Sequence, residues 1–137
     1  MASFVKFYSF VEAVAEKVHN LGADTLKIML TNSAPSQSNT VKANLTDISA
    51  GNGYTAGGTA VTITGSSQTT GTYTLAGNDV VFTASGGSIG PFRYAVLYND
   101  TATNDELIGY WDYASSLTLS SGETFTVDFG ASILTLA

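Results

Sequence analysis

The sequence predicts a mainly β protein, in which one N-terminal amphipathic helix packs on an antiparallel β-sandwich or barrel-like domain. Three observations lead to this fold class. Short apolar runs with a period of two residues recur over most of the chain. Glycine, serine, threonine and asparagine fill the segments between them, as is usual where turns join short strands. One stretch near the N-terminus instead shows the 3.6-residue period of a helix.

The 137 residues are predicted to form a single domain over 1–137. A chain of this length can bury roughly 68% of its unfolded surface, which is enough for one core. No linker or repeat of fixed period divides it. We expect an N-terminal arm at 2–8, a helix at 9–21 and a β domain at 25–137.

The helix predicted at 9–21 has a start signal, an apolar stripe and a stop signal. Ser9 and Glu12 have the spacing of a capping box, and Gly22 is suited to the left-handed residue that ends a helix. The apolar stripe consists of Phe10, Val14, Val18 and Leu21. The helix is therefore expected to lie against a sheet.

The rest of the chain reads as short strands joined by turns and polar loops. Strands are predicted at 25–32, 59–64, 72–76, 80–85, 92–99, 106–113, 116–119, 123–129 and 132–137. In the first of these, Leu26, Ile28 and Leu30 alternate with Lys27 and Met29, which predicts one apolar face. A tight turn at 77–79 is expected to join 72–76 and 80–85 as a hairpin. Polar loops are predicted at 33–44 and 49–58.

The segments 92–99 and 106–113 resemble the two arms of a hairpin. If Asn99 lies opposite Glu106, the one arginine, Arg93, lies opposite Asp112. The same register pairs Tyr94 with the single tryptophan, Trp111. Gly109 leaves room on that face for a neighbouring ring. We therefore interpret Arg93 and Asp112 as a structural cross-strand pair rather than as catalytic groups.

No catalytic, cofactor-binding or metal-binding residues are predicted, and the chain is not expected to be an enzyme. Residues 51–56 formally fit G-x-G-x-x-A, but a predicted strand follows where a dinucleotide site needs a helix. His19 is the only histidine, and there is no cysteine to share a metal or a proton with it. The acidic loop at 99–106 lacks the spacing of a calcium-binding loop.

The charge pattern argues against two classes of partner. The net charge is −6, and the five basic residues are scattered singly, so neither nucleic acid nor an anionic membrane is expected to bind. No apolar run approaches the ~18 residues of a spanning helix. The N-terminus shows no secretory signal, so we expect a soluble chain that is not exported by that route.

Candidate interface residues are the aromatic side chains outside the predicted elements. Phe4, Phe7 and Tyr8 lie in the arm at 2–8, where the helix pattern does not need them. Tyr54 lies among the glycines of 49–58 and could serve as an exposed anchor. The alternative is that the arm packs on the protein's own sheet and that the loop is a turn.

Five segments, read in order, resemble one family. They are "FVEAVAEKVHNLGADTLKIMLTN", "GNGYTAGGTA", "ASGGSIGPFRYAVLYNDTAT", "LIGYWDY" and "GETFTVDF". Over nearly the whole chain the sequence resembles small virion structural proteins of tailed bacteriophages and prophages. The resemblance implies an auxiliary capsid decoration or cement protein, which binds the major capsid protein on the virion surface after synthesis in the bacterial host cytoplasm. It also implies self-association, for which a homotrimer is one arrangement.

Two alternative functions stay open at this point. One is another virion role, as a tail or head-fibre protein. The other is a carbohydrate-binding β-sandwich module, suggested by the tyrosines and the acidic loop. The resemblance brings no catalytic motif that could be carried over to residues of this chain.

Overall fold

The computed structural model describes residues 2–137 and confirms the predicted fold class, a mainly antiparallel β protein with one short N-terminal α-helix. Its elements in chain order are β1 Phe4–Lys6, α1 Phe10–Ala15, β2 Leu26–Thr31, the 3₁₀ helix η1 Lys42–Asn44, β3 Thr59–Ala60, β4 Ile63–Thr69, β5 Thr72–Gly77, β6 Val80–Thr83, β7 Ile89–Asn99, β8 Leu107–Leu119, β9 Thr124–Val127 and β10 Leu134–Leu136. No helix among the described residues has the length and apolar character needed to cross a membrane.

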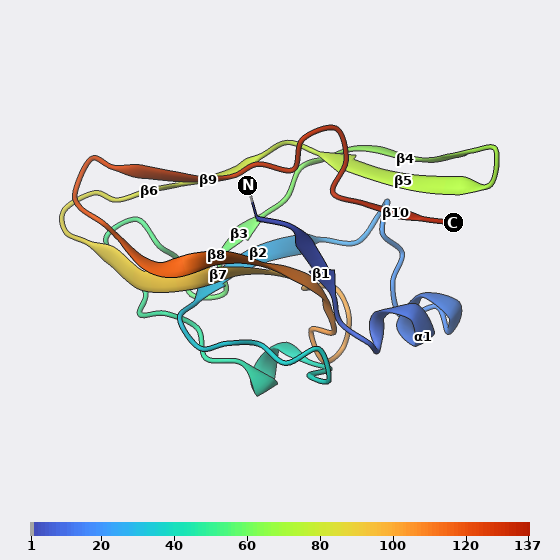
Figure 1. Ribbon diagram of the computed structural model, residues 1–137, viewed down its shortest axis with the longest axis horizontal. Helices are drawn as coiled ribbons and strands as arrows, with labels where there is room; N and C mark the ends of the chain where they lie inside the picture. The colour runs from blue at the N-terminus through green and yellow to red at the C-terminus, as the bar shows by residue number, and fades with distance from the viewer. Residues whose placement is uncertain (1) are drawn as a thin grey trace.

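The strands form two layers, and an irregular segment covers the outer face of one of them (Figure 1). The central layer is a five-stranded antiparallel sheet in the order β1-β8-β7-β2-β3. The second layer contains the sheet β10-β5-β4 and the pair β6-β9. The main apolar core fills the space between these layers. The segment 32–48, which includes η1, lies on the opposite face of the central sheet (Figure 1).

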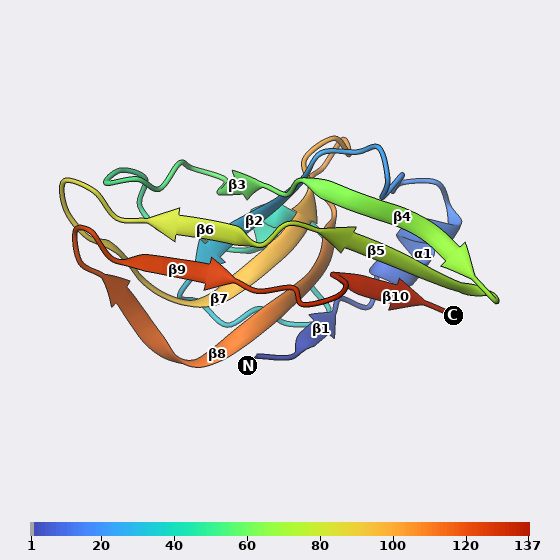
Figure 2. The ribbon, with the colours of Figure 1, turned by 90° about the horizontal axis from the view of Figure 1, so that it is seen from above.

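The second layer does not contain the hairpin predicted between 72–76 and 80–85. β5 pairs with β4 and β10, whereas β6 pairs with β9. Figure 2 shows that β5 and β6 lie end to end, as do β9 and β10. The chain does not reverse at 77–79 because the backbone N–H of Asn78 donates to the Thr62 carbonyl across 2.9 Å, which keeps it alongside the preceding strand. The sharp reversal occurs instead at Thr70 and Gly71, both of which have positive φ.

β2 is buried on both faces rather than on one. Leu26, Ile28 and Leu30 face the main core as predicted. Met29 points to the opposite face and belongs to a second, smaller cluster beneath the sheet. That cluster also contains Phe7, Val96, Tyr98 and Leu107, and Leu45 of the covering segment packs on it. The extra layer of loop therefore explains why Met29 is apolar.

The helix is shorter than the predicted 9–21, because α1 ends at Ala15. The N–H of Val18 donates to the Ala13 carbonyl and that of Lys17 to the Val14 carbonyl, which is the Schellman pattern of a helix end. Lys17 occupies the left-handed position with φ 67°, so Gly22 is not the stop. The predicted capping box is also wrong, because Ser9 has helical dihedral angles and makes no side-chain cap bond.

The hairpin register is correct at the loop and wrong further along the strands. Asn99 hydrogen bonds to Glu106 as predicted, and Tyr98 pairs with Leu107. A bulge then shifts the register by one residue, so that Leu97 pairs with Gly109. Since side-chain direction alternates, this shift exchanges the faces of all following residues in β8.

The bulge separates the predicted pair of Tyr94 and Trp111. Trp111 pairs with Ala95 and faces the main core. Tyr94 lies on the other face, beside the ring of Tyr110, with ring centroids 6.4 Å apart. The room above Gly109 is filled by the ring of Phe4, as expected for a neighbouring aromatic.

Candidate functional site

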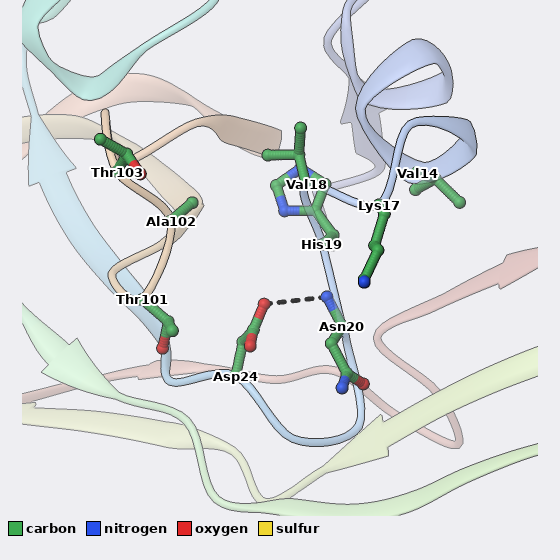
Figure 3. A pocket seen from close by; sticks show the side chains of 9 residues that line it. All are labelled: Val14, Lys17, Val18, His19, Asn20, Asp24, Thr101, Ala102 and Thr103. Atoms are coloured by element: carbon green, nitrogen blue, oxygen red, sulfur yellow. Dashed lines mark hydrogen bonds between the residues drawn. The ribbon is translucent and has the colours of Figure 1, made fainter.

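A pocket lies where the segment after α1 meets the β7–β8 loop. It has a volume of about 580 Å³ and is bounded by residues 14–24 on one side and 101–103 on the other (Figure 3). Its polar lining consists of Lys17, His19, Asn20, Asp24, Thr101 and Thr103. No single element could form this pocket, because its two walls are about eighty positions apart in the chain.

A buried hydrogen-bond network holds the two walls together. The side-chain N–H₂ of Asn99, the last residue of β7, donates to Asp24 Oδ2 at 2.7 Å and contacts His19 Nδ1 at 2.9 Å. Its Oδ1 accepts the backbone N–H groups of Thr101 and Ala102 at 3.0 and 3.2 Å. This arrangement fixes the amide orientation, because an oxygen that accepts two N–H groups cannot be the nitrogen. His19 Nδ1 is therefore the acceptor, and the neutral ring carries its hydrogen on Nε2.

His19 is buried, and it is held in the neutral form. Burial lowers the pKa of His19, and the negative charges of Glu106 and Asp24 offset only part of that effect. Protonation would also place two donors, Nδ1–H and the Asn99 amide, against each other. Within residues 2–137, Nε2 has no hydrogen-bond partner. The ring packs beside Phe10, with centroids 5.6 Å apart.

The pocket offers hydrogen bonding rather than an assembled set of reacting groups. In the described chain His19 shares a hydrogen bond with Asn99 and with no hydroxyl group. Asp24 Oδ2 already accepts the Asn20 N–H at 2.8 Å in addition to the Asn99 amide. Lys17, two residues beyond the end of α1, also lines the pocket (Figure 3). Residues 2–137 contain no group of three histidine, cysteine or acidic side chains placed to hold a metal ion.

Tyr54 is a buried structural residue and not an exposed anchor. Only 3% of its surface is exposed, and its ring packs against Phe82. Its hydroxyl donates to Asp47 and accepts the backbone N–H of Leu30 at 3.1 Å. Burial, together with the bond to Asp47, raises the pKa of Tyr54 far above its usual range. The sequence interpretation of this residue is therefore corrected.

The glycine-rich segment around Tyr54 is tightly packed. Asp47 Oδ2 accepts the N–H of Gly57 at 2.7 Å, and the Gly57 carbonyl accepts the Tyr98 hydroxyl at 2.6 Å. Gly58 has φ +86°, and its α-carbon lies so close to the carbonyl of Ile28 that a side chain would collide with it. These glycines permit close approach to β2 rather than mobility.

The arm at 2–8 divides between the core and the surface. Phe7 is completely buried, and Phe4 packs edge-on against Trp111 with centroids 5.3 Å apart. Both side chains are held by the protein's own sheet, because β1 pairs with β8. Phe7 is therefore corrected from an interface to a packing residue, whereas Phe4 is only partly buried and its interface role stays a prediction. Tyr8 is different, since 62% of its surface is exposed.

Arg93 and Asp112 form the expected ion pair in spite of the register shift. Arg93 Nε lies 2.8 Å from Asp112 Oδ1, and the second contact, from a terminal guanidinium nitrogen to Oδ2, is 3.1 Å. Hydrogen bonds from Arg93, and then from the Ala114 N–H, lower the pKa of Asp112. The hydrogen bond to Asp112 raises the pKa of Arg93. The pair lies on the surface, in direct contact with none of the pocket residues.

The sequence did not identify Asp24 and Asn99 as partners of His19. The local sequence around His19 supplies no partner, because Asn99 comes from the end of a distant strand. The sequence signal for this site is Asn99 itself, a polar residue that ends a strongly apolar run. Comparison of the chain with family models, curated proteins and solved structures found no match.

Proposed function

We propose that this chain is a structural virion protein of a tailed bacteriophage, and that it decorates or cements the capsid by binding the major capsid protein. The observation that carries the proposal is the resemblance of five segments, in order along nearly the whole chain, to small phage virion proteins. A β-sandwich whose polar clusters hold loops in place suits a rigid module of this kind. The proposal assigns no catalytic role to any residue.

The capsid-facing surface is proposed at the start of α1. Tyr8 and Val11 are three positions apart, and 62% and 49% of their surfaces are exposed. Tyr8 lies in the turn directly before the N-cap Ser9, and Val11 lies in the first turn of α1. Exposed aromatic residues are enriched at interfaces. Many copies, each bound weakly through a small patch, would together stabilise a capsid through multivalency.

The test is the location and effect of the protein in particles. Particles of the phage or prophage that encodes the chain would be prepared with and without its gene. We expect antibody labelling over the head, and particles without the protein that lose their DNA at a lower temperature. Labelling confined to the tail would refute decoration and support the tail or fibre alternative.

The proposed surface can be tested separately by binding of the purified protein to heads that lack it. Tyr8→Ser with Val11→Ser should reduce binding at least about tenfold. The matched control is Val81→Ser, which removes a side chain that is 51% exposed on β6. Equal loss in both variants would reject the surface without rejecting decoration itself.

A second candidate function is recognition of a small polar ligand such as a saccharide. The observation that favours it is the pocket beside His19, where Asn20, Asp24 and Thr101 present hydrogen-bonding groups. A glycan array with the wild-type protein tests this candidate, and Asp24→Asn should abolish any signal. An array without signal removes it.

A further inference from the structure

The outer edge of β4 carries no paired strand, and the chain at Gly22 lies against the Ser66 side chain of this strand. β4 is the terminal strand in the order β10-β5-β4, and Figure 2 shows it at the outside of its layer. Its pairing with β5 uses one side of the strand. Within residues 2–137, no backbone hydrogen bond from outside the β4–β5 pair reaches Gly65–Thr69. Such an edge is a template for another strand.

The other sheet edges are short or covered. β3 and β10 contain two and three residues, and β6 and β9, which form a two-stranded pair, contain four each. β1 is capped on its outer side, because Gln37 donates its side-chain N–H₂ to the Lys6 carbonyl at 2.9 Å and accepts the Tyr8 N–H with its own carbonyl. β4 has seven residues, and the straight part after its bulge has no proline and no charged side chain. It thus lacks the usual devices that keep edges apart.

The charge distribution favours a second copy of the same chain as the partner. The protein carries a net charge of −6, so most of its surface repels another copy. The segment 48–78, which includes β4 and β5, contains no charged residue. Two copies can therefore approach edge to edge at β4 without bringing like charges together.

The hairpin turn identifies which backbone groups point outward. Thr70 and Gly71 have φ 50° and 84°, as in a two-residue type I′ turn, in which the closing pair exchanges its hydrogen bonds. The closing pair is Thr69 and Thr72. Because hydrogen-bonded pairs alternate along an antiparallel ladder, Ser66 and Gln68 direct their N–H and C=O groups away from β5.

A second observation supports this alternation. Leu75 lies opposite Ser66, and its carbonyl accepts the Ile133 N–H at 2.7 Å on the far side of β5. Leu75 therefore does not use that carbonyl toward β4. The pair of Ser66 and Leu75 is accordingly one whose backbone groups point away from each other.

We propose that two copies of this chain pair through β4, antiparallel, about a two-fold axis at Ser67. Ser66 then lies opposite Gln68 of the second copy, and the two such pairs exchange four hydrogen bonds. Between these two pairs, Ser67 lies opposite Ser67 of the second copy in a pair without backbone hydrogen bonds. In such a pair the α-carbons approach to about 4.5 Å, and small side chains fit. The product is a six-stranded sheet made from two three-stranded sheets.

The pairing goes beyond the virion role and does not depend on it, because it is argued from the strand edge alone. It differs from the homotrimer that the resemblance implies.

Thr135 supplies a matched control position. It lies opposite Thr74, which in turn lies opposite Ser67, so the three residues share one face of the sheet. Thr135 is exposed, but it belongs to β10 at the other edge.

The first experiment measures mass by sedimentation velocity over a range of protein concentrations. The single chain has a mass of 14.2 kDa, and we expect the wild type to approach twice that value as concentration rises. Ser67→Lys should raise the dissociation constant at least about tenfold, since it opposes like charges across the axis. Thr135→Lys adds the same charge to the same face and should change it less than about twofold. Circular dichroism verifies that both variants are folded.

Three results would overturn the proposal. The first is a wild type that remains a single chain at about 1 mM, well above the affinity range of functional weak dimers. The second is a measured mass of three chains. The third is an equal rise in the dissociation constant of the dimer for the two lysine variants. None of these results bears on whether the protein is found on phage heads, so failure here is distinguishable from failure of the proposed function.

A cross-linking experiment tests the register directly. The chain has no cysteine, so Ser67→Cys introduces a single thiol on the axis. Directly opposed residues of this kind have β-carbons close enough for a disulfide. Under mild oxidation we expect most of the Ser67→Cys protein to become a covalent dimer, while Thr135→Cys remains mostly a single chain. Equal cross-linking of the two variants would reject the axis at Ser67.

Discussion

His19 and Asn99 are 80 positions apart in the sequence, and the Asn99 amide donates to the imidazole Nδ1 across 2.9 Å. Asp24 accepts from the same amide, so a single asparagine links the segment after α1 to the end of β7. Both bonds of the Asn99 side-chain N–H₂ are largely buried and join parts of the chain that are distant in sequence. The protonation state of His19 therefore affects the stability of the fold.

The stability of the protein should decrease as pH falls from 7.5 to 5.5. The folded-state pKa of His19 is lowered, so the unfolded chain binds a proton more readily than the folded chain does. The free energy of unfolding is thus fully retained above the ordinary pKa of about 6.5 and is lost as pH falls below it, by at most about 1.4 kcal/mol per pH unit for one proton. Urea unfolding at several pH values measures the slope.

His19→Asn is the control for this pH dependence. The asparagine oxygen can accept the Asn99 amide in place of Nδ1, but it does not titrate. The variant should be less stable at pH 7.5 and should show a flatter profile between pH 7.5 and 5.5. An unchanged slope would show that other groups, and not His19, cause the loss.

Tyr54→Phe should destabilise the protein by about 2 kcal/mol, because it leaves the buried N–H of Leu30 without a partner. The change also removes the hydroxyl that donates to Asp47. Thermal and urea unfolding provide the measurement. Tyr8→Phe removes the same group from an exposed side chain and should change stability by less than about 0.5 kcal/mol. Similar losses in both variants would contradict a structural role for the Tyr54 hydroxyl.

Gly58→Ala should cost about 2 kcal/mol more than Gly122→Ala. Both glycines have positive φ, +86° and +91°, so alanine suffers similar backbone strain at each. A methyl group at Gly58 also collides with the Ile28 carbonyl, whereas Gly122 has open space around it. The difference between the two unfolding free energies isolates the close packing of the 49–58 segment on β2. A difference near zero would mean that this segment can move away from the sheet.

Lys17→Gly should stabilise the protein by about 1 kcal/mol. Lys17 has φ 67° at the left-handed position after α1, where a side chain costs about 1–2 kcal/mol and glycine does not suffer this penalty. Glu16→Gly is the control, because Glu16 has φ −96° and gains nothing from glycine. It should destabilise the protein by about 1 kcal/mol. Differential scanning calorimetry distinguishes these opposite signs, and a loss in both variants would reject strain at Lys17.

The fold class could be predicted because it depends on local pattern, whereas the pairing of strands could not. The alternation in 25–32 and the apolar run at 92–99 both locate strands that the structure contains. Nothing within 72–85 indicates that β5 and β6 each pair with the C-terminal part of the chain rather than with each other. That choice depends on distant residues, since β5 pairs with Leu134–Leu136 and β6 pairs with Thr124–Val127.

The hairpin shows how one residue limits a sequence-based register. Counting from Asn99 and Glu106 gave the correct first pair, and the bulge at Ile108 then displaced every later one. Ile108, the bulged residue, is neither a glycine nor a proline, so its residue type does not indicate a bulge. Arg93 and Asp112 still meet, because a second register irregularity lies between Phe92 and Tyr94, next to the position where Tyr94 pairs with Asp112. A correct contact was thus reached from a partly wrong register.

The helix end and the pocket were missed for related reasons. Gly22 has the residue type that usually ends a helix, but the hydrogen bonds place the stop at Lys17. The early stop turns the chain so that His19 meets Asn99 instead of continuing a helical stripe. Residue type alone therefore could not locate the candidate site.

The pairing of β1 with β8 sets an order of events during synthesis. Phe4 lies opposite Trp111, so β1 has no partner strand until the long intervening segment and β8 have also been made. Until then Phe7, which is completely buried in the finished protein, remains in contact with water. During that interval the nascent chain exposes an aromatic segment that has not yet been packed, and such a segment is a site at which chaperones or premature aggregation can act.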